Sequence, residues 1–314
     1  MTQRLVSILT VIVLLLASCG GSLPGTSSAP TPSASPAATA AAFPTTLTDF
    51  QGRSVSIAKR PERLVSIGPS ITEFLFALGA GPRVVGDDDF SDEPAAAAKI
   101  EHVGGVKVNL EKVVSLKPDL VLSVKFSDGT IEKLASSGLT VLVVDPQSVA
   151  DVARTASLLG KAVGGDGDAM SKDIQKKVDD VKAKTATATS KPRVYHEIDA
   201  SDPTKIFTVG PGSYIDDLIN LAGGVNIAAK ATTAYPQLSA EEILRADPEV
   251  IVLAAADYSA KPDQVSARTG WSAITAVKNR RFGTIAPNLI NRPGPRVAEA
   301  ADAYARIVHP ELYK

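Results

Sequence analysis

The sequence predicts an α/β protein of two similar lobes, each a mainly parallel sheet flanked by helices, with one long helix between the lobes. From residue 47 onward, short apolar strand patterns alternate with helix patterns, which is typical of βαβ units. Two stretches about half the chain apart also share one pattern: "SIGPSITEFLFALG" (66–79) and "TVGPGSYIDDLINLAG" (208–223). Each reads as a strand end, a Gly-Pro turn, a serine, an acidic residue three positions later, an apolar helix and a closing glycine. The repeat predicts that the two halves form topologically similar lobes.

Length and composition fit two lobes of ordinary size. The chain has 314 residues, of which 44% are hydrophobic and 21% charged, so it can bury a sizeable core. Its net charge of −1 gives no general attraction to nucleic acids or anionic membranes. The sequence has no Lys/Arg-rich stripe interleaved with aromatic residues, so we expect no nucleic-acid partner.

The N-terminal segment has the features of a secretion signal. Residues 1–18 are predicted to be a lipoprotein signal peptide: Arg4 precedes an apolar run over 5–16 that is too short for a mature membrane helix. The run ends in "LASC", which matches the bacterial lipobox, and Cys19 is the only cysteine in the chain. A lone cysteine is often a buried thiol, but one placed directly after a secretory run has no core to join. The sequence therefore predicts lipidation of Cys19.

Residues 19–46 are predicted to be a flexible tether. They are rich in Gly, Ser, Thr, Pro and Ala, and the first charged residue after Cys19 is Asp49. Such a composition cannot bury a core. We therefore expect an exported protein, held by its lipid on the outer face of the cell membrane.

The N-terminal lobe is expected over residues 47–165. It begins with a hairpin, "TLTDFQGRSVSI", followed by a buried strand, "RLVSIG". A helix over 70–78 should start with Ser70 and Glu73 forming a capping box. The other elements expected are helices near 110–116 and 130–136 and strands at 119–124 and 140–145.

Residues 166–190 are expected to form the connecting helix. The segment "DAMSKDIQKKVDDVKAKTATA" (168–188) puts Ile174, Val178 and Val181 on one stripe, with charged residues elsewhere. This pattern is typical of a solvated helix that packs through one narrow face. Because a new strand starts directly after it, we interpret it as a rigid connector between the lobes.

The C-terminal lobe is expected over residues 191–314. It starts with a strand, "PRVYHEI", and has a helix at 214–221. The segment "SAEEILRADPEVIVLAA" (239–255) echoes "NLEKVVSLKPDLVLSV" (109–124): a cap, a glutamate, a short helix, a proline and an apolar strand. A last strand, "RFGTIA", precedes a final helix over 295–308 with Pro295 in its first turn.

Motifs for catalysis, metal binding or phosphate binding are not found. The sequence has no G-x-S-x-G elbow, and no arrangement of serine, histidine and acid indicates a triad. His102, His196 and His309 lie far apart and have no ligand-type partner three or four residues away, so no metal site is expected. The Gly-Pro turns could bind anions, but Ser70 and Ser213 are better explained as helix caps. The carboxylates of "GDDDFSDEP" (86–94) read as a polar loop at a strand end.

Residues at predicted strand ends indicate a binding cleft instead. Ligands of doubly wound sheets bind at the carboxyl ends of the strands. Aromatic residues make up only 5% of the chain, so several of them at strand ends are notable, although each alone could be a packing residue. Arg292, held by Pro and Gly in "NLINRPGPR", is interpreted as an exposed cation suited to ligand contact. The candidate ligand-binding residues are Phe90, Phe126, Phe207, Tyr235, Asn288 and Arg292, with Lys125 nearby.

Together these features resemble the substrate-binding lipoproteins of ABC importers, in the class whose rigid helical connector joins two lobes and whose members take cobalamin, haem and ferric siderophores. The resemblance covers residues 47–314 and is strongest to the cobalamin-binding branch. It is carried by "RLVSIGPSITEFLFALGA", "FSDEPAAAAKIEHVGG", "NLEKVVSLKPDLVLS", "FTVGPGSYIDDLINLAGGVNI", "YPQLSAEEIL" and "NRPGPR". It implies a non-enzymatic receptor without a cofactor, which captures a corrinoid and delivers it to a dimeric permease with its ATPase subunits. Haem or a ferric siderophore is the alternative ligand.

The resemblance also implies roles for single residues. Phe90 matches a tyrosine that contacts the corrin, Phe207 a contacting phenylalanine and Tyr235 a contacting tryptophan. Arg292 matches an arginine that approaches the ligand, and Asn288 falls where an aspartate is found.

Two further matches concern the permease, and two departures concern the N-terminal lobe. Glu111 and Glu241 match two glutamates, one per lobe, that dock onto arginines of the permease. Two tryptophans of the cobalamin binders are missing, where this chain has Val106 and Val124. Phe126, two residues after the second position, is a candidate replacement.

A surface-anchored hydrolase on an α/β frame is the rival hypothesis. It would require a nucleophile or a carboxylate pair with an aligned partner. The two similar lobes, the aromatic loops and the matching exposed acids favour the receptor.

Overall fold

The computed structural model describes residues 42–202, 204–254 and 260–314. All of them belong to one compact unit of the chain, Ala38–Lys314. The predicted signal peptide, Cys19 and most of the predicted tether lie outside the described residues. Within the described residues, no helix is both long and apolar enough to cross a membrane.

The N-terminal lobe is built on a four-stranded parallel sheet with the strand order β4-β3-β5-β6. Its strands are β3 (Leu64–Ile67), β4 (Val84–Gly86), β5 (Leu120–Val124) and β6 (Val141–Val144). The predicted hairpin is confirmed as the antiparallel pair β1 (Thr45–Thr48) and β2 (Ser54–Ile57). The helices are α1 (Pro69–Ala77), α2 (Leu110–Ser115), α3 (Thr130–Ser136) and α4 (Val149–Val163), with 3₁₀ turns η1 (Gly81–Arg83) and η2 (Ala97–Lys99).

The C-terminal lobe has a mixed sheet with the order β10-β8-β7-β11-β12, and β9 pairs with β7 outside this path. Its strands are β7 (Arg193–Asp199), β8 (Ile206–Thr208), β9 (Val225–Asn226), β10 (Gln237–Leu238), β11 (Val250–Ala254) and β12 (Phe282–Ile285). The helices are α6 (Tyr214–Leu221), α7 (Ala240–Ala246), α8 (Pro262–Ser266), α9 (Thr275–Lys278), α10 (Pro287–Ile290) and α11 (Val297–Val308), with 3₁₀ turns η3 (Trp271–Ala273) and η4 (Pro310–Tyr313). The predicted α/β class with parallel strands flanked by helices is confirmed.

The two repeated segments differ in the direction of their strands. β8 runs antiparallel to β7, whereas β3, its counterpart in the N-terminal lobe, is parallel to both of its neighbours. β7 ends at Asp199 and β8 begins at Ile206, so the connection is too short for a crossover helix and the chain must turn back on itself. The repeated segments therefore share a strand–turn–helix pattern but not a strand direction.

Successive side chains of a strand point to opposite faces of its sheet, and in both lobes the side chains on both faces are buried. On β5, Leu120 and Leu122 join one hydrophobic cluster, and Val121 joins another. The first cluster continues through α1, α4, α5, α6 and α11 to β7 and β11, so one apolar core is shared by the two lobes. Helices α2 and α3 cover the other face of the N-terminal sheet, and α7 to α9 cover the other face of the C-terminal sheet.

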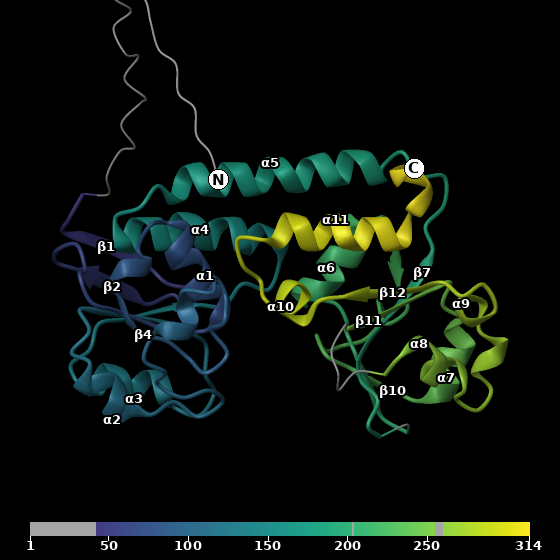
Figure 1. Ribbon diagram of the computed structural model, residues 1–314, viewed down its shortest axis with the longest axis horizontal. Coiled ribbons are helices and arrows are strands. Elements are labelled where there is room, and N and C mark those ends of the chain that lie inside the picture. The colour runs from purple at the N-terminus through teal and green to yellow at the C-terminus, as the bar shows by residue number, and fades with distance from the viewer. Residues whose placement is uncertain (1–41, 203, 255–259) are drawn as a thin grey trace, which may run out of the picture. The chain divides into compact units, whose positions relative to one another are not determined.

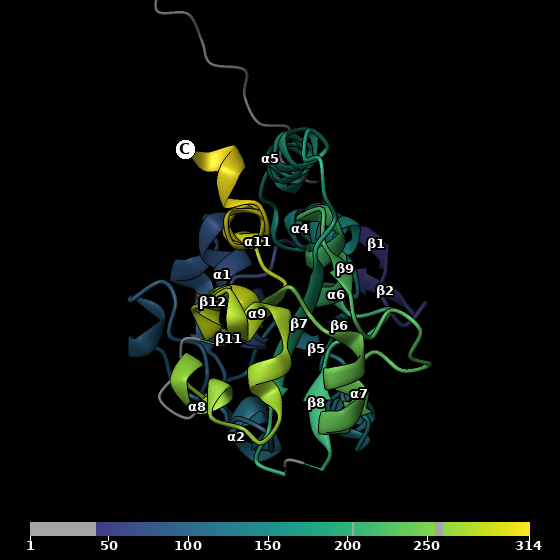
Figure 2. The same ribbon diagram turned by 90° about the vertical axis from the view of Figure 1, so that its right-hand side faces the viewer.

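The long helix α5 (Gly167–Thr185) packs on α4 and α11 (Figures 1 and 2). Its Ile174, Val178 and Val181 are buried, as the apolar stripe predicts, and most of its other side chains are exposed. The helix thus contacts elements that belong to each of the two lobes.

Helix α1 does not begin with the predicted capping box. Its N-cap is Gly68, without a side-chain cap, and the helix starts at Pro69, so Ser70 already lies inside it. Gly68 has φ 143° and ψ 121°, a conformation suited to glycine, and a Cβ there would lie 2.7 Å from Val124 Cγ1. In "GPGS" the extra glycine places the serine one residue farther from the proline than in "GPS". Ser213 is the N-cap of α6, as predicted, and accepts from Asp216 N at 3.1 Å. Glu73 is consequently available for another partner.

Candidate ligand-binding site

A cavity of about 430 Å³ lies between the two lobes. The segment after β6 lines it from the N-terminal lobe, and β7, β8, α6 and the loop after α10 line it from the C-terminal lobe. The described lining residues are Pro146, Gln147, Ile198, Phe207, Tyr214, Ile215, Tyr235, Asn291 and Pro293. None of these described residues carries a charge. The larger hollows at the surface of the C-terminal lobe are lined by none of the predicted ligand residues.

Phe207 and Tyr235 are brought together by strand pairing. Phe207 lies on β8 opposite Gln237 of β10, and Tyr235 stands two residues before Gln237. The two aromatic side chains line the cavity and are 39% and 52% exposed. Large apolar side chains left partly exposed in this way mark interaction sites. Burial and the negative charge of Asp145 raise the pKa of the Tyr235 phenol, so this hydroxyl stays protonated and can donate.

Tyr214 also lines this cavity, and it carries a buried hydroxyl. It is the first residue of α6, which Ser213 caps. Its side chain is 5% exposed, and its hydroxyl has no hydrogen-bond partner among the described residues. Burial raises the pKa of this phenol, so it too stays protonated. An unpaired buried hydroxyl is a group that a polar ligand atom or a water molecule can satisfy.

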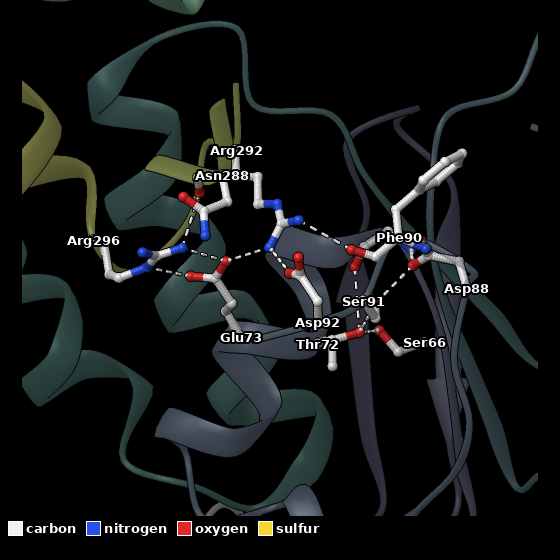
Figure 3. Close-up of polar contacts among 11 residues, drawn as sticks. Ser66, Thr72, Glu73, Asp88, Phe90, Ser91, Asp92, Asn288, Arg292 and Arg296 are labelled. Atoms are coloured by element: carbon white, nitrogen blue, oxygen red, sulfur yellow. Dashed lines mark hydrogen bonds and ion pairs between the residues drawn. The ribbon is translucent and has the colours of Figure 1, made fainter. Parts of the chain in front are cut away.

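Phe90 presents a half-exposed aromatic ring on the N-terminal lobe. Its side chain is 52% exposed and packs on Gly105, where a Cβ would lie 2.9 Å from Phe90 Cε2. Its backbone is fixed at both ends: its N–H donates to Asp88 Oδ1 at 2.9 Å, and its carbonyl accepts from Arg292 Nη2 at 3.0 Å. Asp88 in turn accepts from Gly68 N and Ser91 Oγ, both at 2.8 Å. Phe90 does not line the cavity itself but lies on a loop tied to the C-terminal lobe (Figure 3).

Arg292 is not the exposed cation that the sequence predicts. Its side chain is only 12% exposed and points to the N-terminal lobe, although its neighbours Asn291 and Pro293 line the cavity. Its Nη1 donates to Glu73 Oε1 at 3.3 Å and to Asp92 Oδ1 at 2.6 Å (Figure 3). The Arg292 side chain therefore lies in an ion-pair network that crosses between the lobes.

Arg296 completes this network. It donates from Nε to Glu73 Oε2 and from Nη2 to Glu73 Oε1, both at 2.8 Å, and the hydrogen bonds raise the pKa of its guanidinium. Nη2 also donates to the backbone carbonyl of Asn288 at 2.8 Å. The predicted ligand residue Asn288 thus supplies a backbone acceptor to the network, and it does not line the cavity.

Phe126 is the predicted ligand residue that the structure places away from the others. Its ring packs partly buried against the core between the N-terminal sheet and α2 and α3. It does not line the cavity between the lobes.

The three histidines have separate partners. His102 Nδ1 lies 2.7 Å from Asp87 Oδ1, and His309 Nδ1 lies 2.8 Å from Glu311 Oε1. His196 is buried, its Nδ1 lies 2.5 Å from the Tyr304 hydroxyl, and burial lowers its pKa to about 4. In the part of the chain that the structure describes, no three His, Cys, Asp or Glu side chains come together in a way that could hold a metal ion.

The profile of the family described as "Periplasmic binding protein" matches residues 64–289. The chain belongs to this family. The binding protein is 36% identical over 281 residues to the uncharacterized ABC transporter substrate-binding lipoprotein YvrC of Bacillus subtilis, covering 87% of this chain and 88% of YvrC. It is 31% identical to a cobalamin-binding protein of Halobacterium salinarum, covering 86% and 75% of the two chains. Among solved structures, the haem-binding protein BhuT is similar, with a TM-score of 0.72 and 25% identity over 80% of this chain and 98% of BhuT.

These similarities give the role of the binding protein. It is the substrate-binding component of an ABC importer. Members of this family bind solutes and are not enzymes. The role implies a permease and an ATPase as partners.

Glu111 and Glu241 occupy equivalent places in the two lobes of the binding protein. Each is exposed in the first turn of a short helix, α2 or α7. The caps of these helices are Asn109 and Ser239, which accept from the backbone at 3.0 and 3.2 Å, as the sequence predicts. Neither glutamate lines the cavity, and neither forms an ion pair within the described residues. Figure 1 draws α2 and α7 on the side away from α5.

Sequence reasoning missed the partners of Arg292. The local pattern predicts that Glu73 belongs to a capping box, and it predicts no ion pair for Asp92 or Arg296. A usable signal was present, because Glu73 is the one carboxylate within the apolar run "ITEFLFAL", where a charge is stable only with a partner. Two arginines in "NRPGPR" were available as that partner.

Proposed function

We propose that this binding protein captures a corrinoid, such as cobalamin, in the cleft between its lobes and delivers it to the permease of an ABC importer. The observation that carries the proposal is the cavity whose described lining is apolar, aromatic or neutral and polar, with no charged side chain. A corrin is a large, mostly apolar ring whose edge carries amides. Aromatic side chains bury such a ring, and neutral amide and hydroxyl groups can hydrogen-bond its edge.

We assign the ring contacts to Phe207 and Tyr235 on one lobe and to Phe90 on the other. The hydroxyl of Tyr214 and the amides of Gln147 and Asn291 are suited to amides of the ligand because they offer donors and acceptors without charge. The predicted contacts of Arg292, Asn288 and Phe126 with the ligand remain proposals, and none of the three lines the cavity.

A haem or ferric-siderophore receptor is the alternative, supported by the similarity to BhuT. To separate the candidates, the full-length protein in detergent is incubated with cyanocobalamin, haemin or a ferric siderophore and then desalted. We expect the corrinoid absorbance to elute with the protein. Retained colour with haemin or the siderophore alone would assign the alternative, and no colour with any corrinoid would disprove the corrinoid assignment.

We also propose that Cys19 is lipidated and holds the protein on the outer face of the cell membrane, as the lipobox and the name of YvrC suggest. A Cys19→Ala variant expressed in a bacterial host should leave the membrane fraction. The variant Ser18→Ala keeps a small residue before the cysteine and should stay in that fraction. A Cys19→Ala variant that stays membrane-bound would contradict the anchor.

A further inference from the structure

Four charged side chains meet where the loop after α10 reaches the N-terminal lobe: Arg292 and Arg296 from one lobe, and Glu73 and Asp92 from the other. Every ion pair in this group joins one arginine to one carboxylate. The group therefore holds two positive and two negative charges, which cancel (Figure 3). Arg292 lies between two residues that line the cavity, so its charge would otherwise act on whatever the cavity holds.

The two carboxylates compensate the charge of Arg292, but some of its N–H donors remain unused within the described residues. A guanidinium has five N–H groups, and Arg292 uses three of them, toward Glu73, Asp92 and the Phe90 carbonyl. An anionic group on a ligand would lose hydration in a cavity without charged lining residues and would find no net positive charge to compensate it.

We propose that Asp92 and Glu73 make this cleft selective for uncharged chelates over anionic ones by cancelling the charge of Arg292. The inference rests on the proposed function, since it concerns the same cleft, and it narrows the ligand to a chemical class. Under it, a chelate with carboxylates or catecholates is disfavoured by the protein's own carboxylates rather than by the shape of the cavity.

Asp92 is the better residue for a test. Its side chain is 64% exposed, whereas that of Glu73 is 5% exposed and also pairs with Arg296. The change Asp92→Asn keeps Oδ1 as an acceptor for Arg292 and removes only the negative charge. Asp89→Asn is the matched control: Asp89 is exposed on the same loop and forms no ion pair with Arg292 among the described residues.

The wild type and the two variants, as full-length protein in detergent, are titrated with cyanocobalamin, which has no net charge, and with haemin, which carries two carboxylates. Asp92→Asn should bind haemin about fivefold more tightly, the order expected for one unmasked charge at short range. Cyanocobalamin affinity should stay within about twofold of wild type, because this ligand carries no net charge. The gain in haemin affinity should shrink at about 0.5 M salt. The control Asp89→Asn should change the ratio of haemin affinity to cyanocobalamin affinity by less than about twofold.

The outcomes separate this inference from the proposed function. No gain in haemin affinity for Asp92→Asn, no haemin binding at all, or an equal gain in Asp89→Asn would overturn the inference, even if cyanocobalamin binds. A haemin gain confined to Asp92→Asn, with no cyanocobalamin bound by any variant, would support the inference while disproving the corrinoid assignment.

Discussion

Arg296 and Glu73, 223 residues apart in the sequence, form a two-pronged ion pair between the lobes, with Nε–Oε2 and Nη2–Oε1 distances of 2.8 Å. Arg292 adds a third bond to the same carboxylate at 3.3 Å. The Glu73 side chain is 5% exposed, so its charge is compensated by these guanidinium groups rather than by water. Helix α1 of one lobe is thereby tied to the loop before α11 of the other.

The variant Glu73→Gln should lower the free energy of unfolding by about 3 kcal/mol, because it leaves Arg292 and Arg296 with one exposed carboxylate, Asp92, between them. Urea denaturation measures this loss. Asp302→Asn is the control: Asp302 pairs with Arg306 on the exposed surface of α11, and losing that pair should cost less than about 0.5 kcal/mol. Equal losses in the two variants would show that the Glu73 network does not stabilise the fold.

His196 should make the protein less stable in mild acid. In the folded chain its pKa is lowered to about 4 by burial, against 6.5 ordinarily. Between these values the unfolded chain binds more protons, so the stabilisation is complete above pH 6.5 and is lost as the pH falls toward 4, by about 3 kcal/mol in total. Asp87 acts in the opposite sense, because burial raises its pKa to about 6 and its charged form costs stability as the pH rises from about 4 to 6.

The difference between wild type and His196→Gln isolates the histidine. Unfolding free energies of both proteins are measured at pH 7, 5.5 and 4. The variant should lose less stability than wild type across this range, while the Asp87 contribution stays common to both. Parallel curves would mean that His196 does not titrate as its burial indicates.

The aromatic wall of the cavity gives a prediction about affinity. Tyr235→Ala should weaken cyanocobalamin binding by about 1–3 kcal/mol, as expected for losing an aromatic contact that buries a ring. Tyr313→Ala is the control, because Tyr313 lies after α11 against Lys184 and Arg306, away from the cavity. Isothermal titration calorimetry measures both. An unchanged affinity for Tyr235→Ala would remove this residue from the site.

Local pattern predicted the parts of the fold that local forces determine. The apolar strands, the hairpin β1–β2, the caps Ser213, Asn109 and Ser239 and the buried stripe of α5 follow from periodicity and capping chemistry. The direction of β8 did not follow, because "FTVG" reads as a strand whichever way it pairs. Direction depends on the length of the connection that precedes it, which single-strand patterns do not report.

The candidate site was predictable only in part. Phe207 and Tyr235 line the cavity, because the pairing of β8 with β10 brings them together, and their contact with the ligand stays a prediction. The local patterns mispredict Arg292 and Glu73 for one reason: each has a plausible local role, as a loop cation and as a cap, and their actual partners lie 200 or more positions away. Long-range ion pairs leave no spacing signal in one sequence. Phe126 packs on the core of its own lobe and does not line the cavity, and its contact with the ligand stays a prediction.

Glu111 and Glu241 give the final prediction, which concerns the permease. A glutamate in the first turn of a helix gains about 0.3–1 kcal/mol from the helix dipole, which could explain each residue alone. That effect does not explain why one stands at the same place in each lobe, two residues after a cap that already satisfies the helix start. We propose that the pair meets two arginines of a dimeric permease, since paired exposed acids suit a partner that presents the same surface twice.

The double variant Glu111→Ala, Glu241→Ala should therefore keep ligand affinity within about threefold, because neither residue lines the cavity, while uptake falls more than tenfold, each lost charge pair being worth on the order of 1–3 kcal/mol. Uptake is measured with labelled ligand in cells that carry the native importer. Asp173→Ala with Asp180→Ala is the control, because it removes two exposed charges from α5, on the other side in Figure 1. Reversal of both glutamates to lysine should reduce uptake further, because arginine would then face a like charge. Poor ligand binding combined with a normal transport rate for bound ligand would show that these glutamates serve the caps or the cleft rather than docking.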